Sequence, residues 1–204
     1  MNKQATFYSY YLIAACAIMF VLQLAAPSNA NGLDWVTDTF AITPALALSQ
    51  PWTFITAAFL HGGYMHLLFN MMALFFFGPY LEYKIGGKRF LLLYFAAAII
   101  GNIGYVLISP NPWASGLGAS GAIYGVMGAL AILEPNLEVY LFFLTPLPLW
   151  MVMCGWTLFN LWGVLTSGTG IGYSAHLAGL LAGAAYAYWL KKKSKSILET
   201  YGLD

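Results

Sequence analysis

Residues 90–108 read FLLLYFAAAIIGNIGYVLI, a run of 19 residues without a charged side chain. A helix needs about 20 apolar residues to cross the hydrocarbon core of a bilayer, so this stretch predicts a membrane span. The rest of the chain is similar, because 61% of its 204 residues are hydrophobic and only 7% are charged. Soluble domains carry roughly 25% charged residues. The composition therefore predicts an all-α polytopic membrane protein.

Five further apolar segments accompany this one, and the fourth span is unusually short. From Ser120 to Leu133 it has 14 residues, roughly 21 Å of helix. Such a helix either thins the bilayer or begins below its surface. In the second case the preceding loop enters the membrane, which is tolerated only where the loop packs against protein or lines a water-filled cavity. We expect a single domain over residues 1–204, a six-helix bundle with spans at about 7–26, 63–83, 90–108, 120–134, 147–165 and 173–190.

The basic residues orient these spans. All eight lysines and arginines lie in three places, at Lys3, between 84 and 89, and between 191 and 195. Cytoplasmic loops carry the excess of basic residues, so both termini and the loop after the second span are predicted to be cytoplasmic. The net charge of +1 gives no indication of a nucleic-acid partner.

Two segments near the N-terminus allow more than one interpretation. Residues 1–30 resemble a signal peptide, but the apolar run 7–26 is longer than such peptides usually have, which favours a first span. The connection 27–61 is long and nearly uncharged, so we expect it to lie in the membrane interface, as an inert connector or as a gating element. Its interfacial character comes from Trp35, Phe40, Trp52 and Phe54.

Polar side chains inside spans are costly and usually functional, and four of them are predicted at a similar depth near the external side. The second, fourth and sixth spans all run inward, and they carry His66 and Asn70, Ser120, and His176, respectively. Each residue also has an ordinary explanation, such as helix packing for the serine and interhelical hydrogen bonding for the asparagine. His61 is interpreted as an interfacial or structural residue. The joint pattern indicates a site, although shared depth does not establish contact.

Glycines around Ser120 support this interpretation. The sequence is Gly116-Leu-Gly118-Ala119-Ser120-Gly121, and glycines allow the backbone to approach a ligand closely. Unpaired N–H groups at a helix N-terminus can stabilise an oxyanion. The spacings Gly121-xxx-Gly125 and Gly179-xxx-Gly183 would bring the fourth and sixth spans close together, which a Ser–His hydrogen bond requires.

Three ordered motifs resemble the rhomboid family of intramembrane serine proteases, in its minimal six-span prokaryotic form. The resemblance covers residues 52–189. The GxSG motif alone would be weak evidence for this family, and the specificity comes from all three motifs in order. The motifs are His61-Gly-Gly-Tyr-Met-His66-Leu-Leu-Phe-Asn70-Met, Gly118-Ala-Ser120-Gly121 and Ala175-His176-Leu-Ala-Gly179-Leu-Leu-Ala-Gly183.

The resemblance implies an activity and a role for each matching residue. Such enzymes cleave peptide bonds in or near transmembrane segments of other proteins, here single-span substrates in the cell membrane, at a site open to the external side. Ser120 would be the nucleophile and His176 the general base of a dyad without a carboxylate. His66, Asn70 and the backbone N–H groups of Ser120 and Ala119 would form the oxyanion hole. Tyr124 would pack against His176, supported by Gly118 and Gly121.

Several alternatives remain open at this point. The aromatic–Arg pair that often enters the second span of the family is replaced by Trp52-Thr53, which leaves the conformation of the 27–61 connection undetermined. A rhomboid-like protein without protease activity would bind membrane clients, but the intact Ser120 and His176 argue against it. A transporter would show internal repeats and polar groups near the bilayer centre, neither of which we find in the sequence.

The sequence predicts no cofactor and no metal, because it contains no CxxC, HExxH or clustered acidic ligand set. Cys16 and Cys154 lie in apolar runs and are expected to be buried hydrophobes rather than a disulfide.

Two further segments are candidates for controlling access to the site. The glycine-rich connection 166–172 is a candidate cap, and the fifth span, with Trp150, Trp156, Phe159 and Trp162, is by family resemblance a candidate lateral gate.

Overall fold

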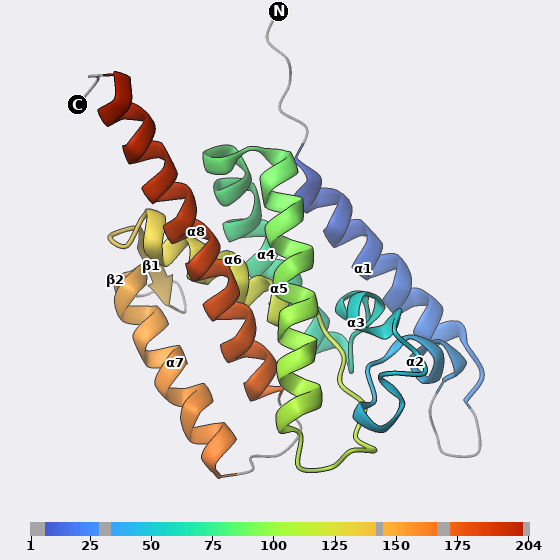
Figure 1. Ribbon diagram of the computed structural model, residues 1–204. Coiled ribbons are helices and arrows are strands. Elements are labelled where there is room, and N and C mark those ends of the chain that lie inside the picture. The colour runs from blue at the N-terminus through green and yellow to red at the C-terminus, as the bar shows by residue number, and fades with distance from the viewer. Residues whose placement is uncertain (1–6, 29–33, 142–144, 167–171, 202–204) are drawn as a thin grey trace, which may run out of the picture.

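The computed structural model describes residues 7–28, 34–141, 145–166 and 172–201, and in these ranges it is a helical bundle (Figure 1). Each predicted span corresponds to one long helix, and the predicted all-α membrane fold is confirmed. The long helices are α1 (Tyr8–Ala25), α4 (Tyr64–Ile85), α5 (Gly87–Ile108), α6 (Ser120–Leu133), α7 (Leu149–Leu165) and α8 (Tyr173–Tyr201).

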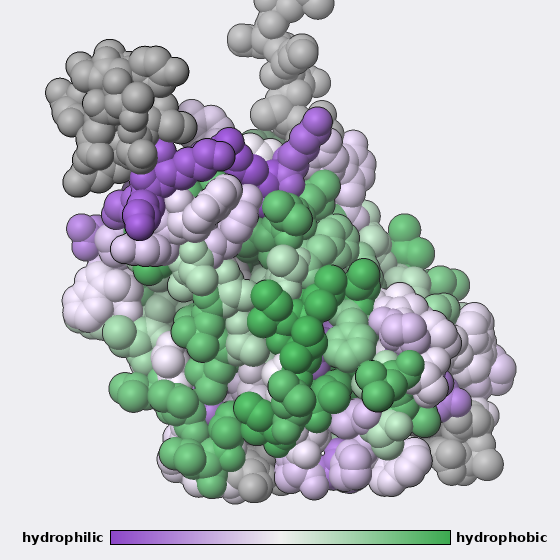
Figure 2. All heavy atoms as spheres, viewed as in Figure 1, coloured by the Kyte–Doolittle hydropathy of each residue, from purple (hydrophilic) through white to green (hydrophobic). Residues whose placement is uncertain are grey.

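Three of these helices, among the residues that the structure describes, are long and apolar enough to cross a membrane: α1, α4 and α5. The apolar helices α6 and α7 are shorter, with 14 and 17 residues. The number of six spans therefore stays a prediction. Figure 2 shows a largely hydrophobic middle zone, with hydrophilic side chains gathered at the end of the bundle where α1 begins and α8 finishes.

Several helix ends differ from the predicted spans, and two of these differences have a clear structural cause. Helix α7 begins at Leu149 rather than at 147, because the preceding residues form an antiparallel hairpin of β1 (Glu138–Leu141) and β2 (Thr145–Pro148). Helix α8 continues past residue 190 to Tyr201. Its basic tail contains no proline or glycine before Tyr201 and lysine is a good helix former, so leaving the apolar zone does not end the helix.

Helix α6 lies at the centre of the bundle, where nine of its 14 residues are buried. Close approach depends on glycine: a Cβ atom at Gly179 of α8 would overlap the backbone carbonyl of Gly121 on α6, and one at Gly183 would overlap that of Gly125. The close packing predicted from the two Gly-xxx-Gly spacings is confirmed. Helix α5 packs on the same pair, since a Cβ at Gly101 would lie 3.0 Å from the carbonyl oxygen of Ala175.

The connection between α1 and α4 is folded rather than extended. It contains α2 (Trp35–Phe40), α3 (Thr53–Thr56) and two 3-10 turns, η1 (Pro44–Leu46) and η2 (Ala57–Phe59). It also binds the segment that leads into α6: Ile42 and Gly116 exchange backbone hydrogen bonds of 2.9 and 2.7 Å, and the N–H of Gly118 donates to Ala57 O. These bonds fix the chain immediately before Ser120.

A buried carboxylate ties α1 to α4. Glu82 is only 4% exposed, and its oxygens accept hydrogen bonds from the N–H groups of Tyr8 and Ser9, at 2.7 and 3.0 Å, and from the Ser9 hydroxyl. These N–H groups open α1 and have no acceptor within their own helix. At the protein surface, Lys84 donates to Glu134 at 2.5 Å.

Candidate active site

Ser120 is the first residue of α6, and the residues before it set its backbone. Gly118 has φ +130°, a conformation that residues with a side chain rarely adopt. Ala119 is the N-cap residue of α6 and is fully buried. The first N–H groups of a helix have no partner within it and carry the positive end of its dipole. A negatively charged oxygen near Ser120 would be stabilised by these groups.

The structure brings His176 into hydrogen-bond contact with Ser120. His176 lies in the first turn of α8, and its Nε2 is 2.8 Å from the Ser120 Oγ. Gly179 follows one turn later at the backbone contact with Gly121. The short distance between serine and histidine therefore depends on the absence of a side chain where α6 and α8 meet.

A third residue, Asn160 on α7, completes the surroundings of the imidazole and was not identified from the sequence. Its Oδ1 lies 2.8 Å from His176 Nδ1, and its side-chain amide donates to the Tyr124 hydroxyl at 3.1 Å and to Trp156 O at 2.7 Å. Asn160 is fully buried in a largely apolar helix. That polar residue within a span was the available signal.

Tyr124, one turn after Ser120 on α6, stacks on the imidazole. The two ring centroids are 4.2 Å apart and the planes differ by 6°. Tyr124 is 8% exposed, and the indole of Trp156 meets it edge-on at 6.3 Å. The ring of His176 is thus held on one face by an aromatic ring and at two edges by hydrogen bonds.

His66 and Asn70 lie on α4, beside this cluster. A Cβ atom at Gly118 would be 2.8 Å from His66 Nε2 and 3.7 Å from Ser120 Oγ, so both groups border the same small space. The other ring nitrogen, Nδ1, accepts a hydrogen bond from the Gly62 N–H at 3.2 Å. Asn70 is buried and donates to His66 O at 2.8 Å. Neither side chain hydrogen-bonds Ser120 among the described residues.

His61 packs behind His66, with ring centroids 5.2 Å apart. It is 2% exposed, and within the described part of the chain neither of its ring nitrogens has a hydrogen-bond partner. Its backbone N–H donates to Gln23 Oε1 at 3.0 Å. Burial lowers the pKa of His61 to about 4, so the ring is neutral at pH 7. This placement agrees with the structural interpretation of His61.

The candidate cap lies mostly outside the described residues, and the role of the fifth span as a gate stays a prediction. Of the connection 166–172, residues 167–171 lie outside the described residues. On α7, the four aromatic residues of the predicted gate are each at least 43% exposed. Cys154, predicted to be buried, is exposed on the same helix, whereas Cys16 is buried as predicted.

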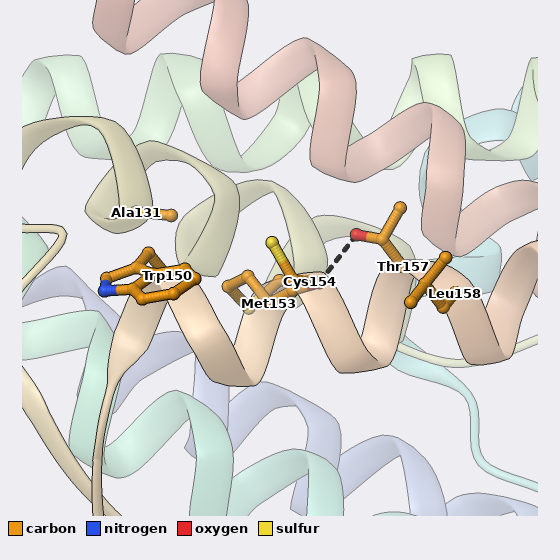
Figure 3. A pocket seen from close by; sticks show the side chains of 6 residues that line it. All are labelled: Ala131, Trp150, Met153, Cys154, Thr157 and Leu158. Atoms are coloured by element: carbon orange, nitrogen blue, oxygen red, sulfur yellow. Dashed lines mark hydrogen bonds between the residues drawn. The ribbon is translucent and has the colours of Figure 1, made fainter.

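A hollow of about 400 Å³ lies between α7 and α6 (Figure 3). Thr157 there donates to the Met153 carbonyl at 2.7 Å and is directed along its own helix. Neither Ser120 nor His176 borders this hollow, so it is separate from the cluster around Ser120. The residues that line it are Ala131, Trp150, Met153, Cys154, Thr157 and Leu158.

Comparison with known proteins places most of the chain in one family. Residues 48–193 match the family model of the Rhomboid domain. The chain is 40% identical over 134 residues to the rhomboid protease GluP of Bacillus subtilis, a match that covers 63% of this chain and 25% of the relative. It is 32% identical over 148 residues to the mitochondrial rhomboid protein 1 of Saccharomyces cerevisiae, covering 68% and 41%.

A third relative matches over nearly the whole chain. The rhomboid protease GlpG of Yersinia pestis is 26% identical over 197 residues, which covers 95% of this chain and 66% of the relative. The chain thus spans between a quarter and about two thirds of the length of these three relatives.

Proposed function

The chain belongs to the rhomboid family, and from this premise we propose that it is a multi-pass membrane serine endopeptidase. It cleaves transmembrane segments of other membrane proteins, with single-span proteins as substrates. The observation that carries the proposal is the 2.8 Å contact between Ser120 Oγ and His176 Nε2 at the N-terminus of a central helix. This distance is within the range required for a serine and its general base.

In the proposed mechanism, Ser120 Oγ attacks the carbonyl carbon of the scissile peptide bond while His176 Nε2 takes the hydroxyl proton. The carbonyl oxygen gains negative charge in the tetrahedral intermediate. His66, Asn70 and the backbone N–H groups of Ser120 and Ala119 stabilise that charge. His176 then gives its proton to the departing amine, which leaves an acyl-enzyme.

Water completes the reaction. His176 removes a proton from a water molecule, the resulting hydroxide attacks the acyl carbon, and the proton returns to Ser120 Oγ as the ester bond breaks. Tyr124 holds the imidazole by stacking. The space beside Gly118, bordered by His66, is where we place the carbonyl oxygen of the substrate.

The protein is proposed to reside in the cell membrane with both termini in the cytoplasm and the site open to the external side. The distribution of basic residues supports this orientation. Figure 1 is consistent with the two termini lying on the same side, because α1 begins and α8 finishes at the same end of the bundle. Water would reach the dyad from the external side.

The proposal is tested by reconstituting the purified protein in liposomes with a model single-span substrate. We expect cleavage by the wild type and none by Ser120→Ala or His176→Ala. Ser49→Ala is the matched control, because the Ser49 hydroxyl donates only to Leu46 O in an exposed turn. A fluorophosphonate probe should label the wild type and not Ser120→Ala.

Two results would overturn the proposal. Cleavage by Ser120→Ala at the wild-type rate would show that another group performs the attack. Absence of both cleavage and probe labelling in folded wild type would leave a rhomboid-like protein that binds membrane clients without cutting them.

A further inference from the structure

We propose that Asn160 is a positioning residue for His176, holding the imidazole in the tautomer that carries its proton on Nδ1. In that tautomer Nε2 is unprotonated and accepts the hydrogen bond from the Ser120 hydroxyl. The inference rests on the proposed function, because it assigns Asn160 a part in preparing the base. It adds a third residue, from a third helix, to a dyad predicted from α6 and α8.

The orientation of the Asn160 amide follows from its partners. Trp156 O is a backbone carbonyl and can only accept, and the nearest Asn160 side-chain atom lies 2.7 Å from it. This atom must therefore be the NH2 nitrogen, Nδ2. The Tyr124 hydroxyl, 3.1 Å away, accepts from the same nitrogen. The remaining atom, Oδ1, faces His176.

The orientation of the amide then fixes the tautomer of His176. An amide oxygen only accepts hydrogen bonds, so at 2.8 Å from Oδ1 the His176 Nδ1 must donate. A neutral imidazole carries one N–H, which leaves Nε2 with a lone pair 2.8 Å from Ser120 Oγ. The direction of donation thus runs from Ser120 through the imidazole to Asn160 and onward to a backbone carbonyl.

Burial makes this arrangement specific. Asn160 is fully buried, and burial of an amide is unfavourable unless its groups are hydrogen-bonded. Its Oδ1 is paired with His176, and its NH2 group has two acceptors. Turning the amide over would place Oδ1 against Trp156 O, two acceptors face to face, so the alternative orientation is strongly disfavoured. In Ser-His-Asp and Cys-His-Asn sites the third residue likewise holds the imidazole tautomer.

A purely structural role for Asn160 predicts different behaviour. Interhelical hydrogen bonds between polar side chains stabilise bundles regardless of any reaction. Loss of such a bond would lower the unfolding temperature and leave both the tautomer of His176 and the pH–rate profile unchanged. A positioning role changes both.

The experiment combines selective 15N-histidine NMR of the full chain in nanodiscs with cleavage kinetics. The chain has three histidines, so spectra are simple, and His176→Ala identifies the signal. The variants are Asn160→Leu, which removes the acceptor, and Asn160→Asp, which keeps one. Thr157→Val is the matched control on α7, because the Thr157 hydroxyl donates only to its own helix.

We expect wild type and Thr157→Val to carry the His176 proton on Nδ1. In Asn160→Leu the proton shifts toward Nε2, and kcat falls about tenfold, equivalent to about 1.4 kcal/mol, while KM stays within about twofold. In Asn160→Asp the proton stays on Nδ1. The acid limb of its pH–rate profile moves to higher pH, because a carboxylate stabilises the adjacent imidazolium.

Three results would overturn the inference: a proton on Nε2 in the wild type, an Asn160→Leu variant with unchanged tautomer and kcat, or an Asn160→Asp profile that does not move. Should Asn160→Leu fail to fold, the wild-type spectrum and Asn160→Asp still decide. The spectrum needs no turnover, so absence of cleavage would refute the proposed function and leave the tautomer assignment to be judged separately.

Discussion

Substitution of Gly179 by alanine tests how tightly the distance between the serine and the histidine depends on helix packing. The added Cβ would lie 2.9 Å from the carbonyl carbon of Gly121 and 3.3 Å from its Cα, and would overlap its carbonyl oxygen. Carbon atoms pack best at about 3.5–4.0 Å. Because the obstacle is backbone, no rotamer change relieves it, and α8 must move away by about 1 Å or more to clear the carbonyl oxygen.

Two effects of the displacement can be estimated. Overpacking typically costs about 1–3 kcal/mol, and we take the upper end because backbone meets backbone. Removing a mid-helix glycine recovers about 0.5–1 kcal/mol, which leaves a net loss of about 2 kcal/mol. A displacement of about 1 Å at a catalytic group can cost about 100-fold in rate. His176, one turn before Gly179, would move with the helix.

The assay compares thermal unfolding and cleavage in the same detergent. A loss of 2 kcal/mol corresponds to a fall in midpoint of about 4–8 °C for a chain of this length. Gly155→Ala is the matched control, because a Cβ there meets nothing within 4 Å and the variant should be as stable as the wild type or more so. A Gly179→Ala variant with wild-type midpoint and rate would refute the packing argument.

Three further substitutions have defined outcomes. Glu82→Gln should lower stability by about 1–3 kcal/mol, because an NH2 group would face donors of Ser9 and the start of α1; an unchanged unfolding midpoint would contradict this. Gly118→Ala should reduce kcat, because its Cβ would lie 2.7 Å from the nearest atom of the His66 ring and because residue 118 has φ +130°, which alanine rarely adopts; wild-type turnover would be the contrary result. Tyr124→Phe keeps the stacked ring and should retain more cleavage than Tyr124→Leu; equal rates would show that stacking is unimportant.

The membrane class followed from the sequence alone. Residues that face lipid and residues that face the core are both apolar, so long uncharged runs indicate spans without any knowledge of packing. The lysine and arginine positions likewise predict orientation, because that depends on charge counts near span ends. Helix starts and glycine spacings are also local features of the sequence. For this reason the position of Ser120 at the start of α6, and the positions of the glycines at which helices meet, could be predicted without knowledge of the packing.

The structure was needed wherever a distance between elements matters. Asn160 lies in a largely apolar run, and its proposed part in orienting His176 depends on how α7 meets α6 and α8. The carboxylate of Glu82, which holds the start of α1, was missed for the same reason. It accepts from Tyr8 and Ser9, which lie 74 and 73 positions away in the chain, and no local pattern encodes such a contact. The hairpin before α7 was also missed, although its two strands are neighbours in the sequence.

What the sequence by itself determined is the class of protein, the position of each long helix, and the residue types available for chemistry. The tertiary structure decided which of these residues meet. In an apolar bundle nearly every side chain can pack against any other, so contact is selected by the few places where backbones approach closely, as at Gly179 and Gly121. Those contacts place Ser120 Oγ 2.8 Å from His176 Nε2, and the position of α7 then places Asn160 behind the imidazole.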